Sequence, residues 1–174
     1  MQKSMSLALA GLLCALLPLS GCTQRTILTG NSSTADSIAP EKNQVIVWFV
    51  RTTEGGTRFV AVKRPQRGND RLASALQELL SGPSDKEIQQ GLGSEIPRGT
   101  ILLGVKHKQG NLEVDLSRRF ASGGGSDTIE ARLSQLQRTV ESNDEKGDVY
   151  LNVEGQRLTM TMGEGIEVPQ PINR

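Results

Sequence analysis

The sequence contains few of the residues that build reactive or stacking sites. Its 174 residues include one histidine, two cysteines, one tryptophan and one tyrosine, and only 3% of them are aromatic. So few aromatic residues argue against a surface that stacks successive sugars or bases, and a single histidine argues against a metal site built from several converging ligands. The 20 basic and 19 acidic residues nearly balance, so the overall charge does not favour binding to nucleic acid. We therefore expect no nucleic-acid partner, no metal and no cofactor.

The one long apolar stretch runs from Leu7 to Leu19 and has the layout of a secretion signal. Its 13 residues fall short of the roughly 20 that a membrane-spanning helix needs. Leu19-Ser20-Gly21-Cys22 then matches the lipobox of bacterial lipoproteins, in which the cysteine thiol is lipidated before the signal is removed. A buried core cysteine is the weaker interpretation, because polar residues follow Cys22. We predict that residues 1–21 are a signal peptide and that Cys22 is the lipidated N-terminus, which holds an extracytoplasmic protein to the membrane in the periplasm or at the cell surface.

A polar tether and one folded domain follow the signal. Residues 22–43 are rich in Thr, Ser, Asn and Ala, which is typical of a segment that does not order itself. From residue 44 onward, β-branched runs that predict strands alternate with two apolar stripes at helical spacing. The predicted strands are 44–50, 57–64, 101–108, 111–116, 149–153 and 158–160, and the predicted helices start at Asn69-Asp70, at Ser84 for one short turn, and at the capping-box pattern Asp127-Thr128-Ile129-Glu130. We predict one α+β domain over residues 44–162, with two helices packed on one face of a mixed or antiparallel sheet in two layers, in the order ββαββαββ. A Gly/Pro-rich tail occupies residues 163–174.

Several motifs in this domain resemble the GerMN domain of sporulation and spore germination proteins. They are Leu79-Leu80-Ser81-Gly82-Pro83, Gly91-Leu92-Gly93-Ser94-Glu95-Ile96-Pro97-Arg98-Gly99-Thr100, Val114-Asp115-Leu116-Ser117 with Phe120, and Arg132-Leu133-Ser134-Gln135-Leu136 with Thr139. The resemblance covers roughly residues 44–162. It implies a fold similar to the ring-building modules of secretion machines. Members that resemble this sequence are commonly extracytoplasmic lipoproteins, and the best understood sporulation members act in the assembly of a transenvelope complex without known catalysis. The best understood members carry two copies in tandem, whereas this sequence shows one copy of the pattern.

Residues that could support catalysis are few and scattered. Glu113 and Asp115 share one face of a predicted strand about 7 Å apart, a spacing that two-carboxylate glycosidases can use, but few aromatic residues are present to hold a sugar. His107 lies on a strand beside lysines, and Ser117 follows Asp115 without an evident base; we expect Asp115 and Ser117 to fix the turn through backbone hydrogen bonds. A basic cluster near the first helix suits an acidic partner or an anionic wall polymer, but is more simply a solvated face; it consists of Lys63, Arg64, Arg67 and Arg71. We predict that the protein is not an enzyme and has no catalytic residues.

The first predicted strand is apolar on both faces. Val45, Val47 and Phe49 alternate with Ile46, Trp48 and Val50. In a two-layer fold helices cover only one sheet face, so the second set needs another cover. Either the C-terminal tail or local structure shields it, or it forms an exposed patch that docks a protein. The hypothesis to be tested is that Ile46, Trp48 and Val50 bind a protein of the envelope.

These features together predict a non-catalytic envelope lipoprotein whose domain acts as an interaction or assembly module. Two alternatives remain open, a cell-wall hydrolase and a carrier for a small ligand. The hydrolase would need a deep acidic cleft, and the carrier a closed apolar cavity. Assembly into a homo-oligomer is also left open.

Overall fold

The computed structural model describes residues 41–144, 147–161 and 165–174. In chain order the elements are β1 (Gln44–Thr53), β2 (Gly56–Pro65), α1 (Arg71–Leu80), α2 (Asp85–Gln89), β3 (Leu102–Lys108), β4 (Asn111–Leu116), the 3-10 helix η1 (Arg118–Ala121), α3 (Ser126–Asn143), β5 (Val149–Val153) and β6 (Gln156–Arg157). The predicted signal peptide, Cys22 and most of the predicted tether lie outside the described residues. Within these ranges, no helix combines the length and the apolar character needed to cross a membrane.

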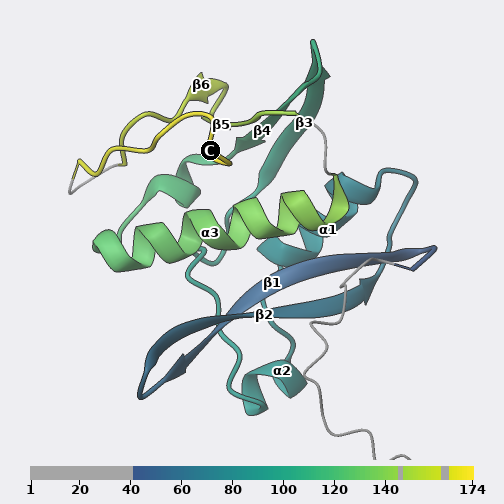
Figure 1. Ribbon diagram of the computed structural model, residues 1–174, viewed down its shortest axis with the longest axis vertical. Coiled ribbons are helices and arrows are strands. Elements are labelled where there is room, and N and C mark those ends of the chain that lie inside the picture. The colour runs from purple at the N-terminus through teal and green to yellow at the C-terminus, as the bar shows by residue number, and fades with distance from the viewer. Residues whose placement is uncertain (1–40, 145–146, 162–164) are drawn as a thin grey trace, which may run out of the picture. The chain divides into compact units, whose positions relative to one another are not determined.

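The strands of the described ranges form two sheets. β1 and β2 make an antiparallel hairpin. The second sheet has the order β3-β4-β5-β6, and β4 and β5 run parallel while its other pairs are antiparallel. Figure 1 shows α1 and α3 between the hairpin and this four-stranded sheet. The α+β class is confirmed, but the single expected sheet is divided in two, because the outer edge of β1 contacts α3 and not another strand.

The capping residues predicted from the sequence mark the starts of α1 and α2 but not that of α3. Asp70 caps α1 by accepting a hydrogen bond from the Ala73 N–H at 2.9 Å, and Ser84 and Glu87 form the capping box of α2. The helix α3 begins at Ser126 with Gly125 as N-cap, so the predicted capping box at Asp127 is wrong. Asp127 lies inside the first turn, where a carboxylate complements the positive end of the helix dipole.

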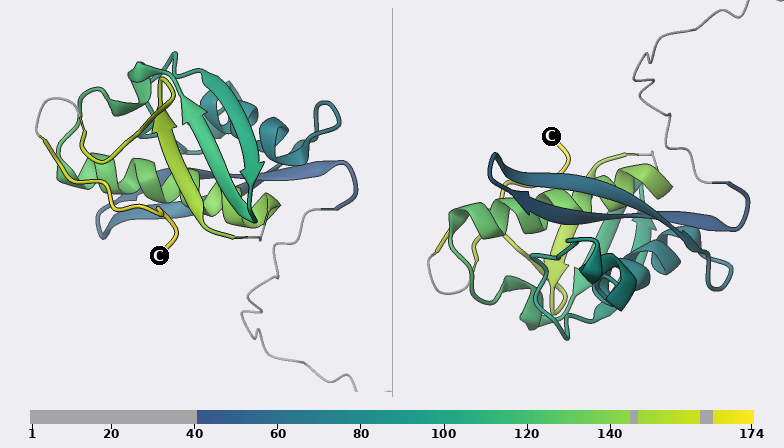
Figure 2. Two further views of the ribbon diagram at one scale, coloured as in Figure 1. Left: turned by 90° about the horizontal axis from the view of Figure 1, so that it is seen from above. Right: turned by 90° about the horizontal axis from the view of Figure 1, so that it is seen from below.

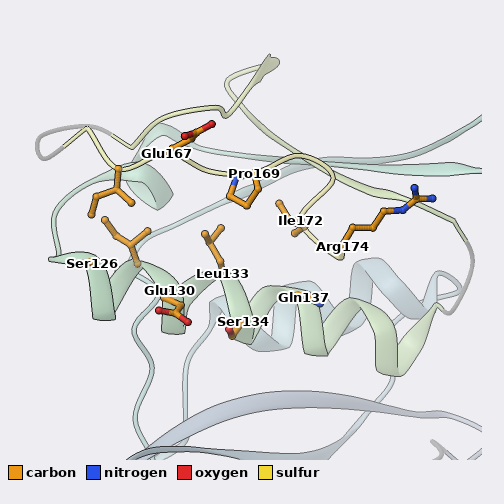
Figure 3. Close-up of a pocket in the computed structure, with 11 residues that line it drawn as sticks. Ser126, Glu130, Leu133, Ser134, Gln137, Glu167, Pro169, Ile172 and Arg174 are labelled. Carbon is orange, nitrogen blue, oxygen red and sulfur yellow. The ribbon is translucent and has the colours of Figure 1, made fainter.

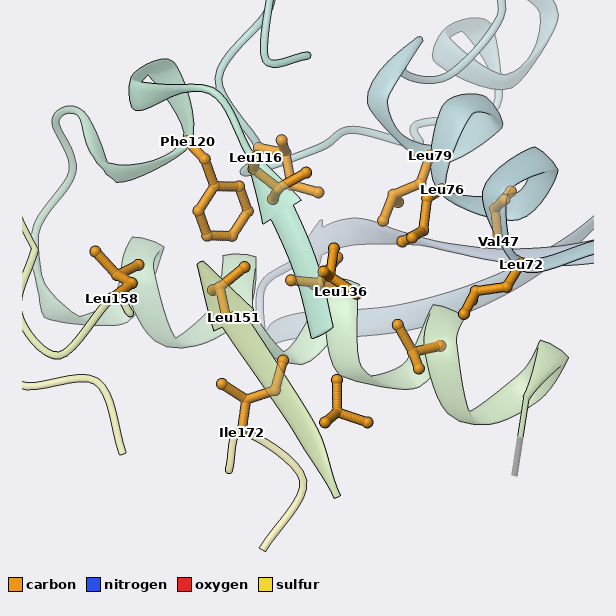
Figure 4. Packing of buried hydrophobic residues seen from close by; sticks show 14 of the residues in the cluster. Val47, Leu72, Leu76, Leu79, Leu116, Phe120, Leu136, Leu151, Leu158 and Ile172 are labelled. Carbon is orange, nitrogen blue, oxygen red and sulfur yellow. The ribbon is translucent and has the colours of Figure 1, made fainter. Parts of the chain in front are cut away.

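The core lies where the helices meet both sheets. Figure 4 shows Leu76 and Leu79 of α1 between Val47 of β1 and Leu116 of β4. The cluster also includes Phe49, Leu72, Leu112, Val114, Phe120, Leu136, Val140 and Leu151, all of which are buried. Each such side chain contributes roughly 1.5–3 kcal/mol relative to an exposed position, so this packing positions α3 firmly between the sheets.

A β-bulge changes the face assignment of β3. Leu102 pairs with Leu116, but the next pair is Gly104 with Asp115, so Leu103 is the extra residue. Ile101 is 59% and Leu103 48% exposed. Strict alternation along residues 101–108 would place Ile101, Leu103 and Val105 on one buried face, but the inserted residue reverses the alternation on one side of the bulge.

The described part of the C-terminal tail is packed against the domain. Ile172 donates its N–H to the Val149 carbonyl at 2.8 Å, and the Gln170 side chain accepts from the Leu151 N–H at 3.0 Å. The left view of Figure 2 shows this yellow segment passing over α3 next to β5. Val168 is 2% exposed and belongs to the core. The tail thus shields β5 and α3.

Candidate interaction surface

The outer edge of β1 is bonded to side chains of α3. The Asn143 side chain accepts from the Ile46 N–H at 3.0 Å and donates to the Ile46 carbonyl at 2.6 Å. Thr139 accepts from the Trp48 N–H at 3.1 Å, and Gln135 donates to the Trp48 carbonyl at 3.0 Å. Positions 135, 139 and 143 recur every four residues and so lie on one helix face. This polar stripe takes the place of a neighbouring strand and satisfies backbone groups that would otherwise be unpaired.

The same helix holds the loop that carries the Gly91–Thr100 motif. Gly93 exchanges two backbone hydrogen bonds with Val50, at 3.0 and 2.7 Å. Next along the loop, the Gln135 side chain accepts from the Glu95 N–H at 2.7 Å, and Arg132 donates to the Glu95 carbonyl at 3.0 Å. The motif residues on α3 therefore position this loop beside β1.

Arg132 is a buried cation that joins three segments. It is 3% exposed, and besides Glu95 it donates to the carbonyls of Phe120 at 2.7 Å and Gly123 at 3.1 Å. Burial lowers the pKa of the Arg132 guanidinium, while the negative charge of Glu95 raises it. Its donors are directed at backbone carbonyls, so its role is to fix the loops around the N-terminal half of α3.

The residues predicted to dock a partner are largely inside the domain. Ile46 is fully buried and Val50 is 3% exposed, so the premise of an exposed patch is wrong for these two. Trp48 is half-buried, and its indole N–H donates to the Ser142 hydroxyl at 2.9 Å. The Arg138 guanidinium lies 5.4 Å from the Trp48 ring centre and 4.7 Å from that of Phe59, a cation–π arrangement. Binding of a partner at the exposed part of Trp48 stays a prediction.

The residues considered for catalysis have structural partners. The Glu113 carboxylate pairs with Arg157 at 3.3 Å, and Asp115 accepts from the Gly155 N–H at 3.0 Å. The Ser117 hydroxyl accepts from the Ile101 N–H at 3.0 Å. Both side chains therefore bond to backbone groups, as expected, but these groups belong to remote segments and not to the turn that follows β4. His107 lies 3.5 Å from Asp144. Within the described ranges no group of three or more metal-ligating side chains is brought together.

The basic cluster near α1 is divided between structural and exposed roles. Arg64 contacts Glu78 at 3.0 Å and Glu87 at 2.5 Å, and it donates to the Gly82 carbonyl at 3.1 Å, just past the end of α1. Burial alone would raise the pKa of Glu87, but hydrogen bonds from Ser84 and the charge of Arg64 outweigh it and lower the pKa below 4.5. The other members lie at the surface: Lys63 and Arg67 are exposed, and Arg71 is half-buried.

A pocket open to solvent lies between α3 and the C-terminal segment. It encloses about 390 Å³, and Figure 3 shows Leu133 of α3 facing Pro169 and Ile172, with Glu130 and Glu167 at one end and Arg174 toward the other. Ile129 and Ile166 complete its apolar lining. We call this the α3–tail groove. The sequence prediction allowed the tail to cover β1 but did not place it against α3, although Ile166, Val168 and Ile172 are apolar residues that favour packing.

Comparisons with known proteins agree with the motifs. The family model described as sporulation and spore germination matches residues 46–159. The first GerMN domain of the sporulation protein GerM from Bacillus subtilis is 19% identical, with a TM-score of 0.57, and the match covers 74% of this chain and 95% of that one. The tandem GerMN domains of the same protein are 21% identical, with a TM-score of 0.54, and the match covers 72% of this chain and 43% of that one. A provisionally named lipoprotein of Clostridium perfringens is 18% identical, with a TM-score of 0.46 and coverages of 71% and 86%. No curated protein matches.

Proposed function

Because this chain belongs to the sporulation and spore germination family, whose domain spans residues 46–159, we propose that it is a non-catalytic, lipid-anchored interaction module of the cell envelope. The lipobox ending at Cys22 supports the anchor. Each methylene of an acyl chain contributes about 0.8 kcal/mol to membrane binding, and several chains together hold a protein stably. The ion pair of Glu113 and the hydrogen bonds of Asp115 and Ser117 within the domain support a role without catalysis.

The α3–tail groove is the observation that carries the interaction role. Its floor is apolar, and the side chains of Glu130 and Glu167 at one end are exposed. An apolar depression with a charged rim is typical of a protein-binding site. Its occupant is a segment of an envelope protein that inserts an apolar side chain beside Leu133 and places a basic side chain next to the two glutamates.

Charge reversal at the rim tests this assignment. The double variant Glu130→Lys and Glu167→Lys leaves the apolar floor intact and changes only exposed side chains, so the domain should fold as before. A photocrosslinking residue that does not react through lysine is placed at position 134, which also lines the groove. In cells it should give a discrete adduct with the parent chain and no adduct with the double variant. Glu54→Lys, an equally exposed change in the turn between β1 and β2, should keep the adduct. An adduct that survives the double reversal would refute the groove as the binding site.

The anchor is tested separately by Cys22→Ser. We expect this variant to incorporate no labelled fatty acid and to accumulate as unprocessed precursor. Fatty-acid labelling that persists in Cys22→Ser would contradict the anchoring proposal and would leave the groove untouched.

A further inference from the structure

The two strands of the hairpin differ in how their outer edges are used. In an antiparallel ladder, residues bonded to the partner strand alternate with residues whose backbone groups point outward. On β1 the outward residues are Ile46, Trp48 and Val50, and all three are bonded to α3 or to Gly93. On β2, whose one neighbour in the sheet is β1, the register makes the outward residues Thr57, Phe59, Ala61 and Lys63. No backbone bond from residues in the described ranges reaches these four.

This free edge lacks most of the features that protect edge strands. Proteins blunt exposed edges with bulges, prolines, short strands, charged side chains or covering loops. Of these features, the outward residues of β2 show one charge, that of Lys63. β2 has ten residues in an unbroken register with β1, and its one proline, Pro65, is the last residue of the strand. Thr57 and Lys63 are exposed, while Phe59 and Ala61 are half-buried. An edge of this length and regularity is a template for another strand.

We propose that β2 pairs with β2 of a second copy of this chain, antiparallel about a two-fold axis at Val60. The pairing joins the two hairpins into one sheet in the order β1-β2-β2-β1. Thr57 then lies opposite the partner's Lys63, and Phe59 opposite the partner's Ala61. All four outward residues of each strand are used, which gives up to about eight backbone hydrogen bonds. Moving the centre to Ala61 would bring Pro65, which has no N–H, into the ladder.

The side chains of β2 complement each other in this register. On one face the large Phe59 meets the small side chain of the partner's Ala61. On the other face Val60 meets the partner's Val60, and Arg58 meets the partner's Val62. No like charges lie directly opposite one another, an arrangement that would destabilise the pairing. With the centre at Ala61, Arg58 would instead face the partner's Arg64, so charge also selects the Val60 register.

A pair of cysteine variants tests both the contact between the two β2 strands and the register of their pairing. Residues opposite each other in a bonded pair have Cα atoms about 5.5 Å apart, within the range of roughly 4.4–6.8 Å that a disulfide spans. Thr57→Cys and Lys63→Cys would meet at this distance across the axis, whereas two copies of either variant would place their cysteines about 20 Å apart. Both positions are exposed, so neither change disturbs the core.

The full chain is expressed in its native envelope, oxidised with copper phenanthroline and separated without reducing agent. We expect a shift to twice the monomer mass when Thr57→Cys and Lys63→Cys are co-expressed, and no shift with either variant alone. The parent chain, with its own cysteines, sets the background, and Leu103→Cys with His107→Cys on β3 should not shift. Ala61→Pro, which removes an outward N–H without breaking the hairpin ladder, should abolish the shift in the co-expressed pair.

Three outcomes would overturn the proposal. The first is the absence of the dimer in the co-expressed pair, and the second is an equal dimer in the single variants. The third is a mixed disulfide with a different protein, which would assign the β2 edge to a foreign strand. None of these results depends on lipidation of Cys22 or on the α3–tail groove, so the failure of this proposal is distinguishable from the failure of the proposed function.

Discussion

Replacing Gln135 by methionine should strongly destabilise the domain without opening a cavity. Gln135 is fully buried; it accepts from the Glu95 N–H at 2.7 Å and donates to the Trp48 carbonyl at 3.0 Å. Methionine has a similar length but forms neither bond, so two backbone groups lose their partner. A buried group left unpaired costs about 1–3 kcal/mol, so the expected loss is about 2–6 kcal/mol. This is a large fraction of the roughly 5–15 kcal/mol that stabilises a typical domain.

The single tryptophan makes the measurement local. Because Trp48 is the one tryptophan of the sequence and its carbonyl is one of the affected groups, its fluorescence follows the site during urea unfolding. The measurement uses residues 22–174 with Cys22→Ser, which removes the predicted anchor. The free energy of unfolding is compared with that of Gln137→Met on the same helix, where the side chain donates a solvent-exposed hydrogen bond to Glu141 at 2.9 Å. That control should change stability by no more than about 0.5 kcal/mol.

Equal stabilities of the two methionine variants would refute the reasoning. They would mean that the polar stripe of α3 does not hold β1 and that the strand is fixed by apolar packing alone.

Three further predictions concern Thr139, Glu87 and Trp48. Thr139→Val, which removes the acceptor of the Trp48 N–H and keeps the shape, should cost about 1–3 kcal/mol of unfolding free energy; a neutral result in urea titrations would contradict the role of this bond. Since the pKa of Glu87 is lowered in the folded state, its contribution to stability is complete above pH 4.5 and is lost as the pH falls through the folded pKa. Glu87→Gln should therefore weaken the pH dependence of the free energy of unfolding below pH 4.5. An unchanged pH dependence would argue against this contribution of Glu87. Trp48→Glu should keep the fold by circular dichroism and lose an envelope partner if this residue docks one, whereas retention of both would end that hypothesis.

Local features of the fold could be predicted from the sequence because they depend on near neighbours. The apolar stripe of Leu72, Leu76 and Leu79 specifies α1 and its buried face, and Asp70 and Ser84 start their helices through bonds to residues three positions away. The family motifs and the lipobox are likewise short patterns in the sequence, so the fold class and the anchor prediction needed no tertiary information.

The candidate sites depended on segments that are distant in the chain. Only the tertiary structure could show that Gln135, Thr139 and Asn143 bond the edge of β1, because helical periodicity places them on a face but does not say what that face meets. This contact buries Ile46 and helps separate the hairpin from the second sheet. The α3–tail groove similarly needs Leu133 and Ile172 to meet. By itself, the sequence determined the fold class, the apolar stripe of α1 and the starts of α1 and α2, because these depend on near neighbours. Packing between remote segments decided which strand edge is covered within the described part of the chain, and which apolar residues are buried.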